Sequence, residues 1–518
     1  MNANLRTGEH YLESLRDGRE VYLDGRRVDD VTSEPGLCGV AETFARMYDL
    51  ARTDEWQDTL TFVAEDGQRY GGAWMEPRDR EQLAWRRAYL QAVARHTGGL
   101  FGRPVDYVPL FHLGMLDIRH DFSRGDAAFE QNIVDYWKYA RERDLALAHA
   151  FIDPPLDPAS ELPETSLLKV VAQTEEGVVV RGVKSVATFA VHADECLVGA
   201  FPRPGLSPEH VVYFSTPMAA KGLRIVAREA YGKGNAFDRP VSQYGDENDA
   251  ILIFDDVFVP WNRVFSYGDP KFALTVFPRI TEWAHWSIIC RLAVKAEVLL
   301  GLCALIPEMV GRARTPQARE ALGETIRYLT TLRAFIHASE DQGKLSTSGY
   351  WMPDSTLVTT GRAYSVEHYR RIISYVQDLG SQGLINMPTE ATFDHPAVGE
   401  TLDRTFSSPS SAARDRARVL HLGWDMVCDS YGGRQTLFEL FNAMPWTAQR
   451  DLLVTQFDAE PYKLLAKATA GMASLDLAAR VVGTGQGDTL DYESMGTVYA
   501  NRSLQPNGDG AQARATAK

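Results

Sequence analysis

Hydrophobic positions follow three successive patterns along this chain of 518 residues. From about residue 5 to 150, apolar residues recur at spacings of three and four, as they do along one face of a helix. GVAETFARMYDLAR and REQLAWRRAYLQAVARHTGG are examples, and the Gly pair that ends the second is typical of a helix C-terminus. The pattern predicts an N-terminal helical domain over residues 1–150.

From about residue 165 to 270 the spacing changes to two, which is the period of a β-strand. SLLKVVAQTEEGVVVRGVKSVATFA predicts a hairpin with its turn at Glu175, Glu176 and Gly177. HVVYFSTPM, LRIVAREA and DAILIFDDVFVPW predict further strands. We expect a middle β domain over residues 151–275, built as a small β-barrel or a sandwich.

Helical spacing returns from about residue 276 to 480, in long segments separated by short Pro or Gly breaks. It predicts a C-terminal helical bundle over residues 276–500, followed by a mobile tail over residues 501–518 that lacks a core pattern. VGTGQGDT at residues 482–489 follows a helix rather than a strand, so it predicts a turn and not a phosphate loop. The predicted fold is mainly α with a central β domain, an order that resembles the acyl-CoA-dehydrogenase-like architecture, in which flavin lies between the domains.

Charge and cysteine content narrow the classes of partner and site. The net charge of −15 at pH 7 disfavours nucleic acid and anionic membranes as main partners, because both reward clustered Lys and Arg. The longest apolar stretch, residues 283–305, contains Arg291, Lys295 and Glu297, and no apolar signal core opens the sequence, so we expect a cytoplasmic protein. Five scattered cysteines, none in a C-x-x-C pair, predict neither disulfides nor zinc, and we expect no metal site.

Arg103 and Tyr107 in GRPVDYVPLFH stand four residues apart and share one face if the segment is helical after Pro104. A guanidinium beside a phenol forms a clamp for an anionic oxygen. The alternative is a surface arginine that packs along a tyrosine ring.

His149 in LALAHAFIDPPLDP ends an apolar run that predicts the end of a helix. One interpretation is that it interacts with the helix C-terminus, and the other is that it faces a ligand. The prolines of IDPPLD impose an extended exit, since each fixes its own φ and restricts the residue before it. Such a segment can lay backbone donors and carbonyls along a planar ligand, so both interpretations stay open.

Two further stretches offer candidate side chains. Ser185 and Thr188 lie on a predicted strand among small residues, which would let a flat ring approach while a hydroxyl reaches its edge. Thr is also common in strands for propensity alone. His285 lies between Trp283 and Trp286 and is either a core imidazole or a base in an aromatic pocket.

Gly432, Gly433 and Arg434 follow a predicted helix, and Asn442 comes shortly after them. The Gly pair is either a simple helix end or, together with the arginine, a corner that binds a phosphate or an oxyanion.

Several of these stretches occur in the same order as the signatures of one family. From about residue 6 to 445, the chain resembles the 4-hydroxyphenylacetate 3-monooxygenase family in RTGEHYLESLRDGREVYLDGRRVDDVTSEP, GRPVDY, HAFIDPPLD, GVKSVAT, YGDENDAILIFDDVFVPWNRVF and DSYGGR. Members of that family are oxygenase components of two-component, reduced-flavin-dependent aromatic hydroxylases.

The resemblance implies a homotetramer of acyl-CoA-dehydrogenase-like fold that takes reduced FAD from a separate flavin reductase. O₂ would add at flavin C4a, and the hydroperoxide would deliver a hydroxyl group ortho to a phenol oxygen. A clamp that favours the phenolate makes the ring more nucleophilic, and a dry pocket slows the wasteful loss of peroxide.

The resemblance also assigns roles to residues. It implies that Arg103, Tyr107 and His149 hold the phenol oxygen, and that the segment from His149 through Phe151, Pro155 and Asp157 runs along the flavin.

In the same way, the resemblance implies that Thr188 lies near flavin N5 and C4a, with Ser185 of the same GVKSVAT motif also at the cofactor. Gly432, Gly433 and Arg434 would meet the cofactor from the C-terminal part. His285 lies near the position at which chlorophenol- and nitrophenol-oxidising relatives carry a base.

The chain departs from the family pattern at three places. Pro158 stands where an Arg often follows PPxD, and Pro104-Val105 stands where a Ser-Pro usually precedes DY. FAVHADECLVGAFPRPG, after Thr188, differs in a region expected to hold the far end of the substrate. The substrate therefore stays open among a chlorinated or nitrated phenol, a tyrosine derivative and a biosynthetic intermediate.

Rival activities on the same fold need other residues. An enzyme like 4-hydroxybutyryl-CoA dehydratase needs a C-x-x-x-C pair for its iron–sulfur cluster, and no cysteine lies between Cys38 and Cys196. An enzyme like acyl-CoA dehydrogenase needs a catalytic carboxylate over the flavin. A catalytically idle flavin-binding protein would have lost the clamp, whose residues are present here.

Overall fold

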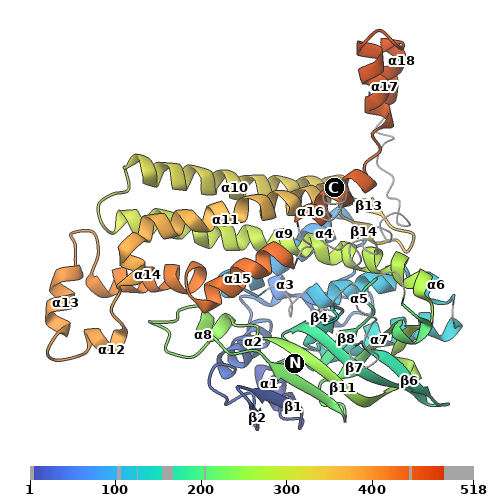
Figure 1. The fold of residues 1–518 in the computed structure, drawn as a ribbon, viewed down its shortest axis with the longest axis horizontal. Coiled ribbons are helices and arrows are strands. Elements are labelled where there is room, and N and C mark those ends of the chain that lie inside the picture. The colour runs from blue at the N-terminus through green and yellow to red at the C-terminus, as the bar shows by residue number, and fades with distance from the viewer. Residues whose placement is uncertain are drawn as a thin grey trace, which may run out of the picture.

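The structure is a computed structural model that describes residues 5–101, 107–124, 126–154, 167–202, 206–442 and 446–483. Among the described residues, helices dominate the N-terminal and C-terminal parts and strands dominate the middle part (Figure 1). The N-terminal part contains α1 (Gly8–Ser14), β1 (Glu20–Leu23), β2 (Arg26–Val28), α2 (Cys38–Leu50), α3 (Gln57–Leu60), β3 (Thr61–Val63), β4 (Arg69–Gly71), η1 (Gly72–Trp74), α4 (Arg80–His96), α5 (Tyr107–Asp117), α6 (Arg119–Phe122), α7 (Ala127–Arg143) and β5 (Leu147–Ala150).

The middle part contains β6 (Lys169–Gln173), β7 (Gly177–Thr188), β8 (Glu195–Val198), η2 (Pro208–His210), β9 (Val212–Pro217), β10 (Leu223–Ala227), α8 (Ser242–Gly245), β11 (Asp249–Pro260), η3 (Trp261–Arg263) and β12 (Val264–Tyr267). Two sheets result, one six-stranded with the order β2-β1-β10-β11-β7-β6 and one four-stranded with the order β12-β9-β8-β5. Their strands are antiparallel except for the pairs β1–β10 and β5–β8, which are parallel. The predicted central β region is present, but its strands form two sheets, and a single closed barrel is not confirmed.

The predicted hairpin is confirmed. β6 and β7 pair antiparallel, with Gln173 opposite Val178. Across the turn, the Thr174 amide donates to the Gly177 carbonyl oxygen at 2.8 Å.

The prediction of a purely helical N-terminal part is incomplete, because that part also supplies strands to both sheets. β1 and β2 extend the six-stranded sheet, and β5 is an edge strand of the four-stranded one. These strands are three or four residues long, which is too short for an alternating pattern to stand out from helical spacing around them. The division of the chain into three domains stays a prediction.

The C-terminal part is helical, as predicted. It contains α9 (Pro270–Glu308), α10 (Pro316–Asp341), β13 (Lys344–Leu345), β14 (Trp351–Met352), α11 (Ser355–Ile385), α12 (Glu390–Phe393), α13 (Gly399–Phe406), α14 (Ala413–Val427), α15 (Ser430–Phe441), α16 (Trp446–Gln456), α17 (Glu460–Thr469) and α18 (Leu475–Gly483). α9, α10 and α11 pack against one another, and α17 and α18 stand away from the rest of the chain (Figure 1). Residues 484–500 of the predicted bundle, which include most of the predicted turn, and the predicted tail at 501–518 lie outside the described residues.

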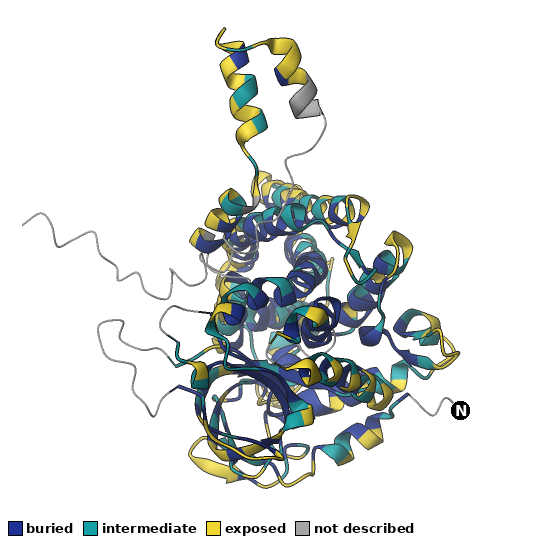
Figure 2. Ribbon diagram, turned by 90° about the vertical axis from the view of Figure 1, so that its right-hand side faces the viewer, coloured by how far each residue is buried: buried dark blue, intermediate teal, exposed yellow. Residues whose placement is uncertain are grey.

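One hydrophobic core extends from the N-terminal helices through both sheets into the C-terminal helices. Buried residues lie where helices face the sheets and one another, and exposed residues lie on the outside (Figure 2). α9 is buried along much of its length, and both Trp283 and Trp286 are fully buried. Within the described part of the chain, no helix is both long enough and apolar enough to cross a membrane.

Candidate active site

A cavity of about 810 Å³ lies between the two sheets and helices α5, α9 and α15. Its size falls within the range of ~300–1,000 Å³ that is typical of small-molecule sites. Six of the predicted site residues border it, namely Tyr107, His149, Phe151, Thr188, His285 and Arg434. The fold therefore brings together, around one space, candidates that are far apart in the sequence.

The other predicted site residues are placed differently. Ser185, Gly432 and Gly433 do not border the cavity. Arg103, Pro155 and Asp157 lie outside the described residues, and the helix predicted after Pro104 is described only from Tyr107, where α5 begins. Asn442, noted after the Gly pair, borders the cavity.

His149 lies on strand β5, so the prediction that it ends a helix is wrong. α7 already ends at Arg143, and β5 pairs with β8 in parallel, with His149 opposite Leu197. The ring centroids of Tyr107 and Phe111 lie 5.5 and 5.2 Å from that of His149. Because a short apolar run suits a buried strand as well as a helix, its pattern could not distinguish them. The imidazole belongs to a cluster of rings at the cavity.

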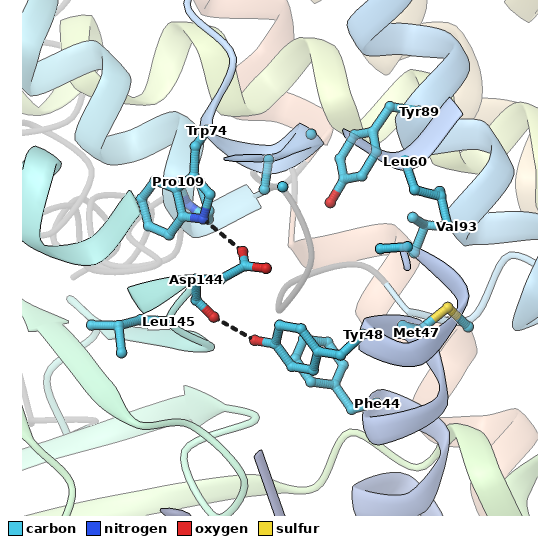
Figure 3. A pocket seen from close by; sticks show the side chains of 14 residues that line it. Phe44, Met47, Tyr48, Leu60, Trp74, Tyr89, Val93, Pro109, Asp144 and Leu145 are labelled. Carbon is cyan, nitrogen blue, oxygen red and sulfur yellow. Dashed lines mark hydrogen bonds between the residues drawn. The ribbon is translucent and has the colours of Figure 1, made fainter. Parts of the chain in front are cut away.

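Asp144 turns the chain from α7 into β5. It adopts a left-handed backbone conformation with φ 49° and ψ 53°. Trp74 Nε1 donates to Asp144 Oδ1 at 3.0 Å, and the Tyr48 hydroxyl donates to the Asp144 carbonyl oxygen at 2.8 Å (Figure 3). Burial raises the pKa of Asp144 to about 6, against the opposing effect of the Trp74 hydrogen bond. These contacts fix the start of the strand that carries His149.

Figure 3 also shows a second cavity, which Asp144 borders together with Phe44, Met47 and Tyr89. Its volume is about 50 Å³, far below that of a site for an aromatic ligand. None of the predicted site residues borders it. The larger cavity is therefore the candidate active site.

Thr188, Asp249 and Arg434 form a polar wall of the larger cavity. Thr188 Oγ1 donates to Asp249 Oδ1 at 2.7 Å. Arg434 holds both carboxylate oxygens, with Nε donating to Oδ2 at 2.8 Å and Nη2 to Oδ1 at 2.7 Å. Arg228 Nε donates to Oδ2 at 3.1 Å. Burial alone would raise the pKa of Asp249, but the two guanidinium groups and Thr188 outweigh it and hold that pKa well below its usual value.

Sequence reasoning did not single out Asp249 or Arg228. Asp249 begins β11 and lies opposite Thr188 across the sheet. Asp246 and Glu247, just before it, are fully buried. Since buried carboxylates need charged or hydrogen-bonding partners, a cluster of acids directly before an apolar strand was the available signal.

Ser185 forms hydrogen bonds with the backbone of the segment that follows Phe151. Its amide donates to the Ile152 carbonyl oxygen at 2.8 Å, and its hydroxyl donates to the Asp153 carbonyl oxygen at 2.9 Å. Lys184 Nζ adds an ion pair with Asp153 Oδ1 at 2.7 Å. These contacts hold the segment that follows Phe151 against β7, which sets the cavity wall between the two.

Gly432 and Gly433 begin a helix and do not end one, which corrects that prediction. α14 ends at Val427, and Asp429 caps α15 by accepting a hydrogen bond from the Gly432 amide at 3.1 Å. A Cβ atom at Gly432 would lie 2.8 Å from Val427 N, so glycine permits the close approach of the two helices. Arg434 follows in the same helix and reaches the cavity.

A buried ion network fixes α15 against α9. Arg291 donates to both Glu439 oxygens, at 2.7 and 2.5 Å. Lys295 Nζ donates to the same carboxylate and to Gln435 Oε1, the latter at 2.8 Å. Burial alone would raise the pKa of Glu439, but Arg291 and Lys295 lower it to about 2. Because α15 carries Arg434, this network sets the position of the polar wall.

His285 lies on α9 at the cavity, together with Phe277 and Thr281 from the two preceding turns. It is half-buried, whereas its neighbours Trp283 and Trp286 are fully buried and do not border the cavity. The imidazole is therefore at the cavity surface and not in the core between the two indoles.

Comparison with known proteins adds a family and a fold. Two family models match, 4-hydroxyphenylacetate 3-hydroxylase N terminal over residues 7–266 and 4-hydroxyphenylacetate 3-hydroxylase C terminal over residues 275–471. The oxygenase component of a 4-nitrophenol 4-monooxygenase/4-nitrocatechol 2-monooxygenase from Rhodococcus opacus is 34% identical over 500 residues, or 94% of this chain and 93% of that protein. The FADH(2)-dependent monooxygenase TftD from Burkholderia cepacia is 30% identical over 88% of this chain and 90% of its own length.

A solved structure gives the same match in three dimensions. The oxygenase component (HpaB) of 4-hydroxyphenylacetate 3-monooxygenase complexed with FAD has a TM-score of 0.86 to this chain at 30% identity. The match covers 92% of this chain and 100% of that one. The predicted fold class, mainly α with a central β region, is confirmed.

Proposed function

Because the chain belongs to the 4-hydroxyphenylacetate 3-hydroxylase family, we propose that it is the oxygenase component of a two-component monooxygenase that hydroxylates a phenol ortho to its hydroxyl group. The observation that carries the proposal is the single cavity bordered by Tyr107, His149, Thr188 and Arg434. In the overall reaction one atom of O₂ enters the ring, the other leaves as water, and FADH₂ is oxidised to FAD.

The cavity fits a flavin. Its volume accommodates a tricyclic ring, its walls are largely aromatic, and one of its walls carries the polar groups of Thr188, Asp249 and Arg434. Reduced FAD, when bound, supplies the electrons that activate O₂. We assign cofactor binding to His149, Phe151, Thr188 and Arg434.

The remaining cofactor assignments are indirect or come from the family resemblance. Ser185 acts by holding the segment after Phe151, and Gly432 and Gly433 act by allowing α15 to start where it does. Pro155 and Asp157 remain predictions from the resemblance.

The phenol oxygen is assigned to Tyr107 and His149, with Arg103 as the third member of the clamp. The rings of Tyr107 and His149 lie side by side at the cavity, with centroids 5.5 Å apart. Hydrogen bonding to the phenol oxygen favours the phenolate, and the phenolate makes the ortho carbon more nucleophilic. His285, on α9 at the same cavity, is the candidate base for the phenol proton.

The substrate class we propose is a para-substituted phenol. The relative from Rhodococcus opacus is named for 4-nitrophenol and 4-nitrocatechol, so free phenols that carry a para substituent are the first to test. Phe201 and Phe277, whose centroids lie 5.3 Å apart at the cavity, provide an apolar surface for such a ring.

An acyl-CoA-dehydrogenase-like activity is the alternative, and it requires a carboxylate that is available as a base. Among the described residues that border the cavity, the one carboxylate is Asp249, which two arginines and Thr188 already bind. A carboxylate held so strongly in its ionised form is a weak base. The geometry therefore favours the monooxygenase.

The proposed activity also implies partners. Reduced FAD has to come from a separate flavin reductase, and we expect the chain to work in the cytoplasm. We expect a homotetramer, which light scattering would support with a solution mass of four chains.

The test is a coupled assay of the full-length protein with a flavin reductase, NADH, FAD and a para-substituted phenol. We expect O₂ consumption with formation of the catechol, detected by mass spectrometry. In His149→Ala, O₂ consumption should continue but yield mainly H₂O₂, because the phenol is no longer held for attack. His10→Ala, on the exposed surface of α1, is the control. A catechol yield that survives His149→Ala would contradict the role of His149.

A further inference from the structure

The segment over residues 149–153 passes from one sheet to the other. Up to Ala150 it belongs to the four-stranded sheet, where β5 pairs with β8 and the Gly199 amide donates to the Ala150 carbonyl oxygen at 3.2 Å. Two residues later it meets β7 of the six-stranded sheet, through an antiparallel bridge between Ile152 and Val186. Because the cavity lies between the two sheets, the segment forms part of its wall. Three of its residues border the cavity, namely His149, Phe151 and Ile152.

Two adjacent residues of β7 bind the backbone of this segment where it changes sheets. A buried carbonyl oxygen needs a donor, and a strand that changes its partner leaves carbonyls outside both ladders. Lys184 Nζ donates to the Phe151 carbonyl oxygen at 3.2 Å. The Ser185 amide donates to the Ile152 carbonyl oxygen at 2.8 Å, and the Ser185 hydroxyl donates to that of Asp153 at 2.9 Å. Each carbonyl from Phe151 to Asp153 is therefore bound by Lys184 or Ser185.

Lys184 is the charged member of this contact, and it is only 2% exposed. Its ammonium group also forms an ion pair with Asp153 Oδ1 at 2.7 Å. A buried ammonium group is costly unless it is both paired and hydrogen-bonded. The favourable position of the segment is therefore the one that keeps the Phe151 carbonyl and the Asp153 carboxylate within reach of Lys184 at the same time.

Lys184 connects two walls of the cavity. β7 carries Lys184 and, four residues later, Thr188 on the polar wall. The segment that Lys184 binds carries His149 and Phe151, whose ring centroids lie 5.6 Å apart in the aromatic cluster. Only a few residues separate the contact from the cavity on either side, so a shift at Lys184 moves one wall relative to the other.

We propose that Lys184 is a positioning residue that sets the distance between the wall that carries His149 and the wall that carries Thr188. Lys184 itself does not border the cavity. The inference rests on the proposed function, because its consequence is how efficiently a phenol held at His149 is hydroxylated. When the phenol is misplaced, its ortho carbon is out of reach, and FADH₂ and O₂ give FAD and H₂O₂ without a change in the phenol.

The experiment measures the ratio of catechol to H₂O₂ formed by the full-length protein from a para-substituted phenol. It is run as a single turnover, with folded protein in excess over FADH₂, so that little free flavin reacts with O₂ in solution. The ratio does not depend on the amount of folded protein, and a loss of stability alone leaves it unchanged. In Lys184→Met, which keeps the length of the side chain but not its charge or donors, the ratio should fall about tenfold, because a shift of a fraction of an ångström changes the rate of attack by that order.

A second variant separates positioning from stability. Lys184→Met leaves the Asp153 carboxylate without its cation, which by itself destabilises the protein. Lys184→Met/Asp153→Asn removes that charge as well, so its thermal unfolding midpoint should recover toward that of the parent. Its catechol ratio should stay low, because the Phe151 carbonyl still lacks its donor. Crystal structures should show a longer distance between the Cα atoms of His149 and Thr188 in this double variant than in the parent.

The matched control is Arg181→Met on the same strand. Arg181 pairs with Asp256 at 2.8 and 2.6 Å, but it is exposed and does not border the cavity. This variant also removes an ion pair from β7, and its catechol ratio should equal that of the parent.

The outcomes distinguish this proposal from the proposed function. A low ratio in both Lys184 variants, with the parent ratio in Arg181→Met, supports it. The parent ratio in Lys184→Met overturns it and leaves the proposed function standing. A ratio that recovers in the double variant also overturns it, because the loss then comes from the unpaired carboxylate. An equal fall in Arg181→Met does so too, because any lost ion pair on β7 would then have the same effect.

Two remaining cases also decide. If Lys184→Met yields no folded protein, the double variant decides by its ratio and by the distance between the two walls, and an unchanged distance overturns the proposal. A parent protein that forms no catechol from any phenol overturns the proposed function and this proposal with it.

Discussion

Gly432 and Gly433 are adjacent in the first turn of α15 but have different surroundings. A Cβ at Gly432 would lie 2.8 Å from Val427 N, whereas a Cβ at Gly433 would have nothing within 4 Å. We expect Gly432→Ala to destabilise the protein by about 1–3 kcal/mol, the typical cost of overpacking. Gly433→Ala should stabilise it by up to about 1 kcal/mol, because Ala is the better helix former.

The measurement for this pair is thermal denaturation, followed by flavin titration of each variant. Gly432→Ala should also weaken flavin binding, since α15 carries Arg434 two residues further on. Similar effects of the two substitutions would contradict the close contact between α14 and α15.

Residues that border the cavity could be predicted where a short sequence motif marks them. They could not be predicted where their role depends on a partner that is distant in the sequence. Tyr107, His149 and Thr188 stand in recognisable motifs, so sequence reasoning singled them out, and all three border the cavity. Asp249 looks like an ordinary acid at the start of a strand until its pairing with Thr188 and its contact with Arg434 are known. Both relations are tertiary, and hydrophobic periodicity carries no information about them.

At the scale of elements, the position of α15 depends on one buried carboxylate. Glu439 is the acceptor for both Arg291 and Lys295, and all three side chains are buried. Glu439→Gln leaves two buried cations without a counter-charge, which should cost about 3–5 kcal/mol of stability. We expect a clear fall in the thermal unfolding midpoint and weaker flavin binding.

Glu324→Gln is the matched control for Glu439→Gln, because it removes a carboxylate from an ion pair at the surface. Glu324 pairs with Arg327 one turn later on α10, where the arginine is exposed, and such pairs contribute about 0–1 kcal/mol. Equal midpoints for Glu439→Gln and Glu324→Gln would show that the buried network does not hold α15.

Long elements were predictable from periodicity, and short ones were not. α9, α10 and α11 extend over many turns, so their helical spacing is unmistakable. β5 has four residues, and the same letters that make it a strand also suit the end of a helix. Its strand character comes from pairing with β8, nearly fifty residues later, and a local pattern cannot show that.

At the scale of the whole molecule, two buried histidines join the N-terminal part to the middle part. The ring centroids of His112 on α5 and Phe265 on β12 lie 6.1 Å apart. His192 Nε2 lies 3.0 Å from the Leu37 carbonyl oxygen. Because a carbonyl only accepts, His192 Nε2 is the donor. Burial lowers the pKa of both imidazoles to about 3.

These depressed pKa values make stability depend on pH in a defined direction. In the unfolded chain a histidine has its usual pKa of about 6.5, so it binds a proton below that pH, while the folded protein keeps His112 and His192 neutral down to about pH 3. Each therefore contributes stability above pH 6.5 that is lost as the pH falls, at up to about 1.4 kcal/mol per pH unit. His112→Leu removes one of these two histidines. Between pH 6 and 4.5, the unfolding free energy of the variant should therefore rise relative to that of the parent by up to about 1.4 kcal/mol for each unit by which the pH falls. Urea denaturation across that range measures it, with the exposed His395→Leu as control. A difference that stays constant with pH would mean that His112 takes up a proton in the folded protein, and so that the packing between α5 and β12 admits a charge.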